Sequence, residues 1–371
     1  MIIRLNSKNR HSYGGAIYID SAKNILISNN SICRNTATAP SSSYNSYGGA
    51  IYFNSIVQKV TAVENTISDN SSEIGGGIYS RNSSSIEISS NQIKGSTGTG
   101  IYITASSENS ITCAIYNNVI MNSNNQSSEG GGIFVENYKL IDIRQNLIAN
   151  NKGTKGAGLF LNPASTLFLE NNTIAYNTAE NQGGGIYVAT SNMLNDLSLN
   201  NNIFWANTAG TEGDDIHLLG FGGNPRELYN NTVREISGTF ENTSGNINSD
   251  PLFYDPSNGD YHLQPNSPCI NAANNGGYSD LDNTPTYQTR DIGAYEYNPT
   301  IPHPADTNSN FTIEESEYDA YNNAWRNNLP WTQTPENIPI EYNTRAGFLA
   351  ENGGAYTNTG AMKPLCWTPN Q

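Results

Sequence analysis

The chain has 371 residues, of which 14% are charged, and 18 Lys and Arg stand against 33 Asp and Glu, giving a net charge of −15. This balance excludes a nucleic-acid or anionic-lipid partner, because phosphate binding needs clustered basic side chains. No stretch is apolar for long enough to insert into a membrane as a helix.

Two short sequence words repeat in step along the first two thirds of the chain, about every 30 residues. A period of this length is typical of repeat architectures. The first word is a glycine-rich run followed by an aliphatic residue, at Ile17, Ile51, Ile78, Ile101, Ile133, Leu159, Ile186 and Ile216. The second word is Asn-x-Ile or Asn-x-Val, at Asn30, Asn65, Asn91, Asn118, Asn146, Asn172, Asn201 and Asn231.

The segments between the glycine and asparagine clusters read as short strands. In residues 84–93, Ile86 and Ile88 alternate with Glu87, which is the period of a strand with one buried face. Several strands per repeat of this length predict an all-β fold, a parallel β-helix (solenoid) with three strands per coil. The glycines then serve as corners with positive φ, and the asparagines form a column at a turn.

An aromatic residue follows the aliphatic one in most copies of the first word, and alternation places it on the outer face. Such a column either binds a ligand by stacking, as with sugars, or only stabilises the sheet by about 0.5 to 1.5 kcal/mol per pair. Its members are Tyr18, Tyr52, Tyr79, Tyr102, Phe134, Phe160 and Tyr187.

The words "GGAIY" (Gly14–Tyr18 and Gly48–Tyr52) and "FWAN" (Phe204–Asn207) resemble the GGA-I and F-x-x-N repeats of polymorphic outer-membrane-protein adhesins and other right-handed parallel β-helix surface proteins. Most copies here carry Ile in place of Phe. The resemblance covers residues 12–235. It implies a right-handed coil and a bacterial-type extracellular or cell-surface location.

Residues 250–275 and "RDIGAYEY" at 290–297 are similar to the terminal segment of bacterial secreted β-helix proteins. A solenoid needs an end piece to cover its last strand edges, so we predict a cap. The expected domains are the repeats at 1–235, the last coils and cap at 236–298, and a small C-terminal module at 299–371. Four acids in the cap are candidate ligands or, as Asp beside Pro or Gly favours, turn residues: Asp250, Asp255, Asp260 and Asp291.

After a proline-rich linker at 298–304, residues 306–317 resemble an EF-hand or dockerin-type calcium loop. Oxygen ligands fall at loop positions 1, 3, 5 and 12: Asp306, Asn308, Asn310 and Glu317. Phe311 stands where the glycine of the sharp turn is expected. The alternative is a polar helix N-terminus capped by Thr312 and the acids that follow.

A polysaccharide-degrading enzyme is the main alternative to a structural protein, because many β-helices carry such activities. Asp214 and Asp215 are adjacent acids of the kind that glycosidases use as acid and base. They fall in register with corner glycines, however, which favours a structural role. Asp142 and Arg144 share an outer face, where a surface ion pair is the ordinary explanation.

The four cysteines lack the C-x-x-C spacing of a zinc or thioredoxin site. Cys33 and Cys113 are expected three coils apart, beyond the reach of a disulfide. A bridge between Cys269 and Cys366 would close a long loop and stabilise the fold by on the order of 4 kcal/mol.

These features predict an extracellular structural or adhesive surface protein that contacts itself or surface glycans. The chain enters its first coil within about a dozen residues of Met1, and an uncovered strand edge invites pairing with another chain. Head-to-tail assembly into filaments is therefore expected, unless the chain is a fragment whose true start is missing. The alternative function is a polysaccharide-degrading enzyme or carbohydrate-binding module on a β-helix scaffold.

Overall fold

The computed structural model describes residues 12–39, 45–105, 111–125, 128–189, 196–219, 226–274, 280–333, 335 and 337–370. Contacts group the chain into two compact units. The first comprises residues 1–249, 273–281 and 292–294, and the second comprises residues 250–272, 282–291 and 295–371. The ranges 236–298 and 299–371 thus both contribute to the second unit, and the expected division into three domains stays a prediction.

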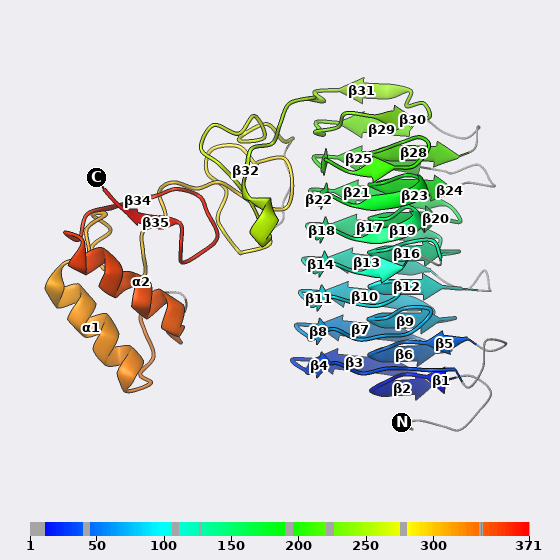
Figure 1. Cartoon of the computed structure of the whole chain (residues 1–371), viewed down its shortest axis with the longest axis horizontal. Helices are drawn as coiled ribbons and strands as arrows, with labels where there is room; N and C mark the ends of the chain where they lie inside the picture. The colour runs from blue at the N-terminus through cyan, green and yellow to red at the C-terminus, as the bar shows by residue number, and fades with distance from the viewer. Residues whose placement is uncertain are drawn as a thin grey trace. The chain divides into compact units, whose positions relative to one another are not determined.

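The first unit is a parallel β-helix, as the repeat predicts. Each of the first seven coils contributes one strand to each of three parallel sheets, and the last two coils contribute strands to the first two sheets (Figure 1). The first sheet contains β2 (Ile17–Asp20), β6 (Ile51–Asn54), β9 (Ile78–Arg81), β12 (Ile101–Thr104), β16 (Ile133–Glu136), β20 (Leu159–Asn162), β24 (Ile186–Ala189), β28 (Ile216–Leu219) and β30 (Ile236–Ser237). The second contains β3 (Asn24–Ser28), β7 (Lys59–Val63), β10 (Ser85–Ser89), β13 (Thr112–Tyr116), β17 (Leu140–Arg144), β21 (Thr166–Glu170), β25 (Asp196–Asn200), β29 (Arg226–Tyr229) and β31 (Asn242–Ser244).

The third sheet is built from three-residue strands: β4 (Ser31–Cys33), β8 (Thr66–Ser68), β11 (Gln92–Lys94), β14 (Val119–Met121), β18 (Leu147–Ala149), β22 (Thr173–Ala175) and β26 (Ile203–Trp205). A smaller fourth sheet contains β15 (Asn124–Asn125), β19 (Lys152–Lys155), β23 (Thr178–Gln182) and β27 (Thr208–Ala209), and β1 (Ser12–Tyr13) pairs with β5 (Ser46–Tyr47).

The core of the β-helix is made by stacking equivalent aliphatic side chains from coil to coil. Ile78 pairs in register with Ile51 and Ile101, and all three are fully buried. The alternation predicted for 84–93 is confirmed, because Ile86 and Ile88 are buried whereas Glu87 is only half-buried. Full burial of such a side chain contributes about 1.5 to 3 kcal/mol.

Glycines form the corners before the first sheet. Gly75 has a φ of +68°, which an L side chain adopts only at a cost. The neighbouring Gly76 is required by close packing of coils instead, since a Cβ there would lie 2.2 Å from the carbonyl oxygen of Thr97. The repeated "GGGIY" word therefore satisfies two structural constraints: a left-handed corner and a close approach between the backbones of neighbouring coils.

The asparagine column is confirmed, with one correction. Asn65 donates both its backbone N–H and its side-chain amide to Oδ1 of Asn91, each at 2.9 Å. The prediction of Asn201 is wrong by one residue, because Asn201 takes the left-handed turn conformation, with a φ of +57°, and Asn202 occupies the column. We call this set the asparagine ladder: Asn30, Asn65, Asn91, Asn118, Asn146, Asn172, Asn202, Asn231 and Asn246.

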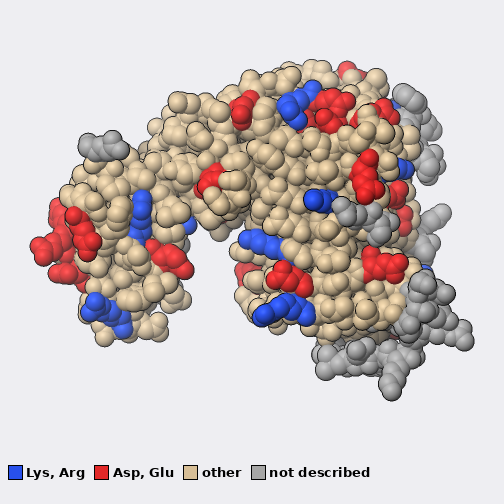
Figure 2. Space-filling model, in the orientation of Figure 1, with Lys and Arg blue, Asp and Glu red and all other residues tan. Residues whose placement is uncertain are grey.

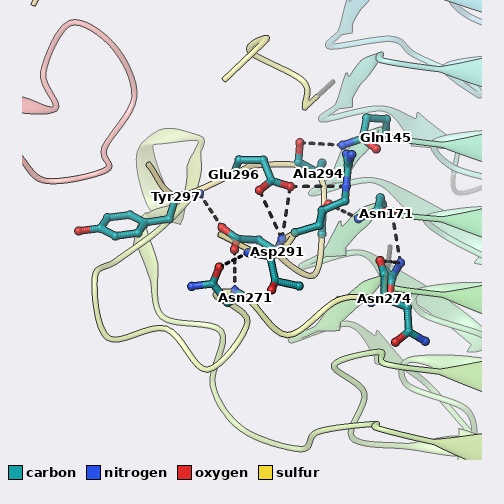
Figure 3. A network of polar contacts seen from close by, with 12 residues as sticks. Gln145, Asn171, Asn271, Asn274, Asp291, Ala294, Glu296 and Tyr297 are labelled. Atoms are coloured by element: carbon teal, nitrogen blue, oxygen red, sulfur yellow. Dashed lines mark hydrogen bonds and ion pairs between the residues drawn. The ribbon is translucent and has the colours of Figure 1, made fainter. Parts of the chain in front are cut away.

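Two short segments from the last third of the chain belong to the first unit and lie along its side. Figure 3 shows them beside the turns that lead into the third sheet. Asn274 donates its N–H to Oδ1 of Asn201 at 3.0 Å, and Ala294 donates its N–H to Oγ1 of Thr173 at 3.0 Å. These contacts cover a flank of the β-helix, while the predicted covering of its last coil stays a prediction.

The second unit combines a hairpin with two helices. The hairpin strands β32 (Phe253–Asp255) and β33 (Asp260–Leu263) are joined by the 3-10 helix η1 (Pro256–Asn258). The helices α1 (Glu315–Arg326) and α2 (Ile340–Glu351) precede the strands β34 (Tyr356–Asn358) and β35 (Trp367–Pro369). Tyr321, Leu349, Tyr356 and Trp367 are central to its core. Within the described ranges, neither helix is long and apolar enough to cross a membrane.

Candidate functional site

The aromatic column predicted on the outer face of the first sheet is present, but most of it is buried. Neighbouring rings stack along the coils, with centroids 4.1 Å apart for Tyr102 and Phe134 and 4.9 Å apart for Phe134 and Phe160. The column lies outside the aliphatic core and forms its own cluster around Phe134, Phe160 and Tyr187. Five members are at most 6% exposed: Tyr52, Tyr79, Phe134, Phe160 and Tyr187.

The burial has a local cause, because the glycine corner of each coil folds against the ring that follows it. A Cβ at Gly130 would lie 2.8 Å from Cβ of Phe134, and one at Gly75 would lie 2.9 Å from Cβ of Tyr79. Ring faces that would stack on a sugar therefore contact each other instead. Tyr18 and Tyr102 remain half-buried.

The column is longer than the sequence pattern indicates. His217 stacks on Tyr187, with centroids 4.8 Å apart and an interplanar angle of 11°. The register of Ile216 with Ile186 could have identified it. Among the described residues, both ring nitrogens of His217 are buried without a hydrogen-bond partner, although Nδ1 lies 3.9 Å from Oε1 of Glu212, and burial lowers the pKa of His217. At the other end, Tyr13 and Tyr47 of the β1–β5 pair join the rings of Tyr18 and Tyr52.

The paired acids that an enzyme would use are engaged by the fold. Asp215 is fully buried and accepts from the side-chain amide of Asn207 at 3.1 Å and from the N–H of Arg234 at 2.8 Å. Burial raises the pKa of Asp215 despite these hydrogen bonds. Asp214 accepts the N–H of Ala209 at 2.7 Å. Both carboxylates thus serve as corner residues that bind the backbone.

The second acidic candidate is a surface ion pair, as expected. Nε of Arg144 donates to Oδ1 of Asp142 at 2.8 Å, and a further guanidinium nitrogen contacts Oδ2. The two residues lie one pleat apart on the outer face of β17. This local pair satisfies both charges.

The four acids of the expected cap accept hydrogen bonds within the second unit. Asp250 accepts the N–H of Leu252, and Asp255 accepts from Ser257 and Asn258 before η1. Asp291 accepts the N–H groups of Asn271 and Tyr297 at 2.7 and 2.6 Å, as Figure 3 shows. Burial raises the pKa of Asp291 to about 6. Asp260 binds His262 and the N–H of Met362.

The residues of the predicted calcium loop lie together at the start of α1. Asp306 is buried and accepts the N–H groups of Asn310 and Phe311 at 3.1 and 2.8 Å, as well as the hydroxyl of Tyr356 at 2.6 Å. Phe311 has a φ of +60°, so it adopts the left-handed turn for which EF-hands use glycine. Asn308 accepts the N–H of Asn310 at 3.0 Å.

Glu317 links the same loop to the helix. It accepts from Thr307 at 2.8 Å and forms a capping box with Glu314, which is the N-cap of α1 and one of the acids expected after Thr312. Two carboxylates and two amide oxygens fit a hard cation such as calcium, and the turn at Phe311 fits the loop. The same contacts also make the loop a helix cap.

The predicted bridge between Cys269 and Cys366 is wrong, because all four cysteines of the described chain are thiols. Cys33 and Cys113 lie on β4 and β13, three coils apart as expected. Burial raises the pKa of Cys366 to about 12, which keeps it protonated and unreactive at neutral pH.

The family model described as "Right handed beta helix region" matches residues 2–173 and 59–247. These overlapping ranges extend over more than half of the chain and include every strand of the β-helix. A comparison with curated proteins returns no match. The agreement between the family model and the three parallel sheets is sufficient to assign the fold, and the chain therefore belongs to the right-handed β-helix family.

Proposed function

We propose that the chain is an extracellular structural or adhesive surface protein whose β-helix serves as a rigid scaffold. The observation that carries the proposal is the engagement of the candidate catalytic acids: Asp215 binds Asn207 and the backbone, and Asp142 binds Arg144. An acid that works on a substrate needs an accessible oxygen, which a buried turn residue does not offer.

The outer surface is compatible with this role. Figure 2 shows basic and acidic side chains scattered among uncharged ones on the visible face. Long polar columns, such as the asparagine ladder, direct their hydrogen bonds from coil to coil and are largely buried. A solenoid built in this way is stabilised along its axis because every coil is hydrogen-bonded to the next.

Attachment provides the test of the adhesive role. Beads coated with the purified chain should bind to cell or glycan-coated surfaces, and antibodies raised against the β-helix should label intact, unpermeabilised cells. Labelling that appears only after permeabilisation would argue against a surface location.

Calcium binding belongs to the same proposal. Asp306, Asn308, Asn310 and Glu317 would hold the ion, which would supply a cross-link between the loop and α1. Two amide ligands in place of carboxylates make the expected affinity modest. Support comes from the oxygen-rich donor set and the left-handed Phe311.

Head-to-tail assembly is the further part of the proposal. Among the described residues, β2 pairs only with β6 and β31 pairs only with β29, so both have an edge able to accept a strand. Residues 1–11, which adjoin the first coil in sequence, lie outside the described residues. Electron microscopy should show fibres with an axial repeat of one subunit; dispersed monomers at high concentration would refute assembly.

A further inference from the structure

A cavity of about 720 Å³ lies within the second unit, a size typical of small-molecule sites. Its walls are mainly apolar, and five polar side chains line the same space. The apolar wall includes Ile301, Pro302, Pro339, Met362 and Trp367, and the polar side chains are Asp282, Asn283, Gln333, Tyr342 and Lys363.

The apolar wall is held in place by hydrogen bonds. The indole N–H of Trp367 donates to the carbonyl oxygen of Ile301 at 3.1 Å, and Nε of Arg345 donates to the carbonyl oxygen of Trp367 at 2.6 Å. The ring of Tyr342 packs against Trp367 edge to face, with centroids 5.6 Å apart. A wall fixed in this way loses little entropy when a ligand binds.

Asp282 is positioned by a buried histidine. Nε2 of His262 lies 2.8 Å from Oδ2 of Asp282, and its Nδ1 lies 2.6 Å from Oδ1 of Asp260. Burial opposes the charged imidazole, but the two carboxylates raise the pKa of His262 to about 9. The carboxylate of Asp282 is thereby fixed and ionised, and 31% of its side chain remains exposed.

Lys363 and Tyr342 are the other ionisable side chains of the lining. Nζ of Lys363 donates to Oγ1 of Thr284 at 3.3 Å, and its charge helps to lower the pKa of Asp282. Burial raises the pKa of Tyr342 to about 12, with smaller contributions from Cys366 and Asp282. The phenol therefore remains a hydrogen-bond donor at neutral pH.

One anion, one cation and one phenol give the cavity a balanced charge. A ligand with one charge would be attracted by one of Asp282 and Lys363 and repelled by the other, whereas adjacent hydroxyls can donate to the carboxylate and accept from the ammonium at once. The C–H faces of a sugar ring suit the apolar surface of Pro339 and Met362. We infer that this cavity binds a neutral pyranose unit of a glycan.

The inference names the chemical class of ligand that the proposed adhesive role would use. Only the biological purpose of the cavity rests on that role. The site lies entirely within the second unit and involves neither the β-helix nor the calcium loop. Absence of glycan binding would therefore not contradict the proposal of a scaffold. Absence of surface labelling would not contradict the proposal that the cavity binds a glycan.

Isothermal titration calorimetry with the whole chain tests the site. The probes are neutral tetrasaccharides of glucose, mannose, galactose and xylose, with galacturonic acid and glucosamine tetramers as the acidic and basic counterparts. We expect at least one neutral probe to bind at a single site. Lys363→Met and Tyr342→Phe should each weaken its binding by about tenfold, the effect of one lost hydrogen bond.

Lys152→Met, an exposed lysine on β19, is the matched control and should bind as the parent chain does. Circular dichroism checks that each variant is folded. If Lys363→Met does not fold, the test rests on Tyr342→Phe. Absence of binding by every neutral probe, tighter binding of a charged probe, or unchanged binding by both variants would overturn the inference.

Discussion

The side-chain amide of Asn118 donates to Oδ1 of Asn146 at 3.0 Å, and the backbone N–H of Asn118 donates to the same oxygen at 2.9 Å. Both side chains are fully buried. Each Asn in the middle of the asparagine ladder thus satisfies backbone groups of its own turn and of the neighbouring coils. The ladder couples successive coils through buried polar groups, which cannot form hydrogen bonds with water instead.

Asn118→Ala should destabilise the β-helix by about 3 kcal/mol or more, because it leaves several buried donors and acceptors without partners. Asn30→Ala is the matched control at the exposed end of the ladder and should cost less than about 1 kcal/mol. Urea unfolding followed by far-UV circular dichroism measures both. Equal effects of the two substitutions would contradict a cooperative ladder.

Phe134→Ala should cost about 3 to 5 kcal/mol, the range for removing a buried aromatic side chain. Its ring lies between Tyr102 and Phe160, so the substitution leaves a gap in the aromatic column. Tyr18→Ala, at the half-buried end of the column, should cost less. Thermal unfolding of both variants checks the order; a Phe134→Ala protein as stable as its parent would restore a ligand-binding role for the column.

Alkaline pH should destabilise the second unit through His262. Its pKa is about 9 in the folded chain against 6.5 for the free group, so the folded state holds the proton more tightly. The contribution is fully present below pH 6.5 and is lost as the pH rises through 9, on the order of 3 kcal/mol in all. On the acid side, the lowered pKa values of Asp260 and Asp282 mean that their contribution is lost as they become protonated.

Urea unfolding between pH 6 and 10 measures this dependence. A Trp205→Phe background leaves Trp325, Trp331 and Trp367, which all belong to the second unit, as fluorescent reporters. His262→Gln should be less stable at pH 7 and should show little further loss between pH 7 and 10. A parent chain whose midpoint does not change over this range would contradict the charged state of His262.

Chelation should lower the unfolding midpoint of the second unit and leave the β-helix unaffected, if the loop at Asp306 binds calcium. Terbium luminescence provides a direct titration of the loop. Asn308→Ala should weaken it, since this exposed side chain offers an oxygen at loop position 3. Asn337→Ala, an exposed residue of the same unit outside the loop, should not. Identical titrations for both variants would assign the loop to helix capping alone.

The fold could be predicted from the sequence because stacked coils repeat their constraints. Ile86 and Ile88 indicate a strand, and Gly75 indicates a corner, each in a copy of the same word. The period places the aromatic column on the outer face, but it could not show that a corner folds back over the following ring and buries most of the column. Asn201 and Asn202 are adjacent asparagines, and only the hydrogen bonds distinguish the turn residue from the ladder residue.

The cavity of the second unit could not be predicted from sequence patterns. Asp282, Tyr342 and Lys363 are far apart in the chain and share no repeat or motif. The role of His262 could not be predicted from the sequence either, because it depends on two carboxylates that the hairpin and the segment around Asp282 place beside the ring. Sites of this kind depend on tertiary packing, which an irregular segment encodes without periodicity.

The central claim is that the β-helix is a scaffold and that its acidic side chains stabilise the fold instead of acting on a substrate. It is tested most directly by incubating the purified chain with acidic and neutral polysaccharides, with and without calcium, and measuring new reducing ends and unsaturated products. We predict no products above those of a heat-denatured control. Product formation by the parent chain that is lost in Asp214→Asn or Asp142→Asn would contradict the claim and identify an enzyme.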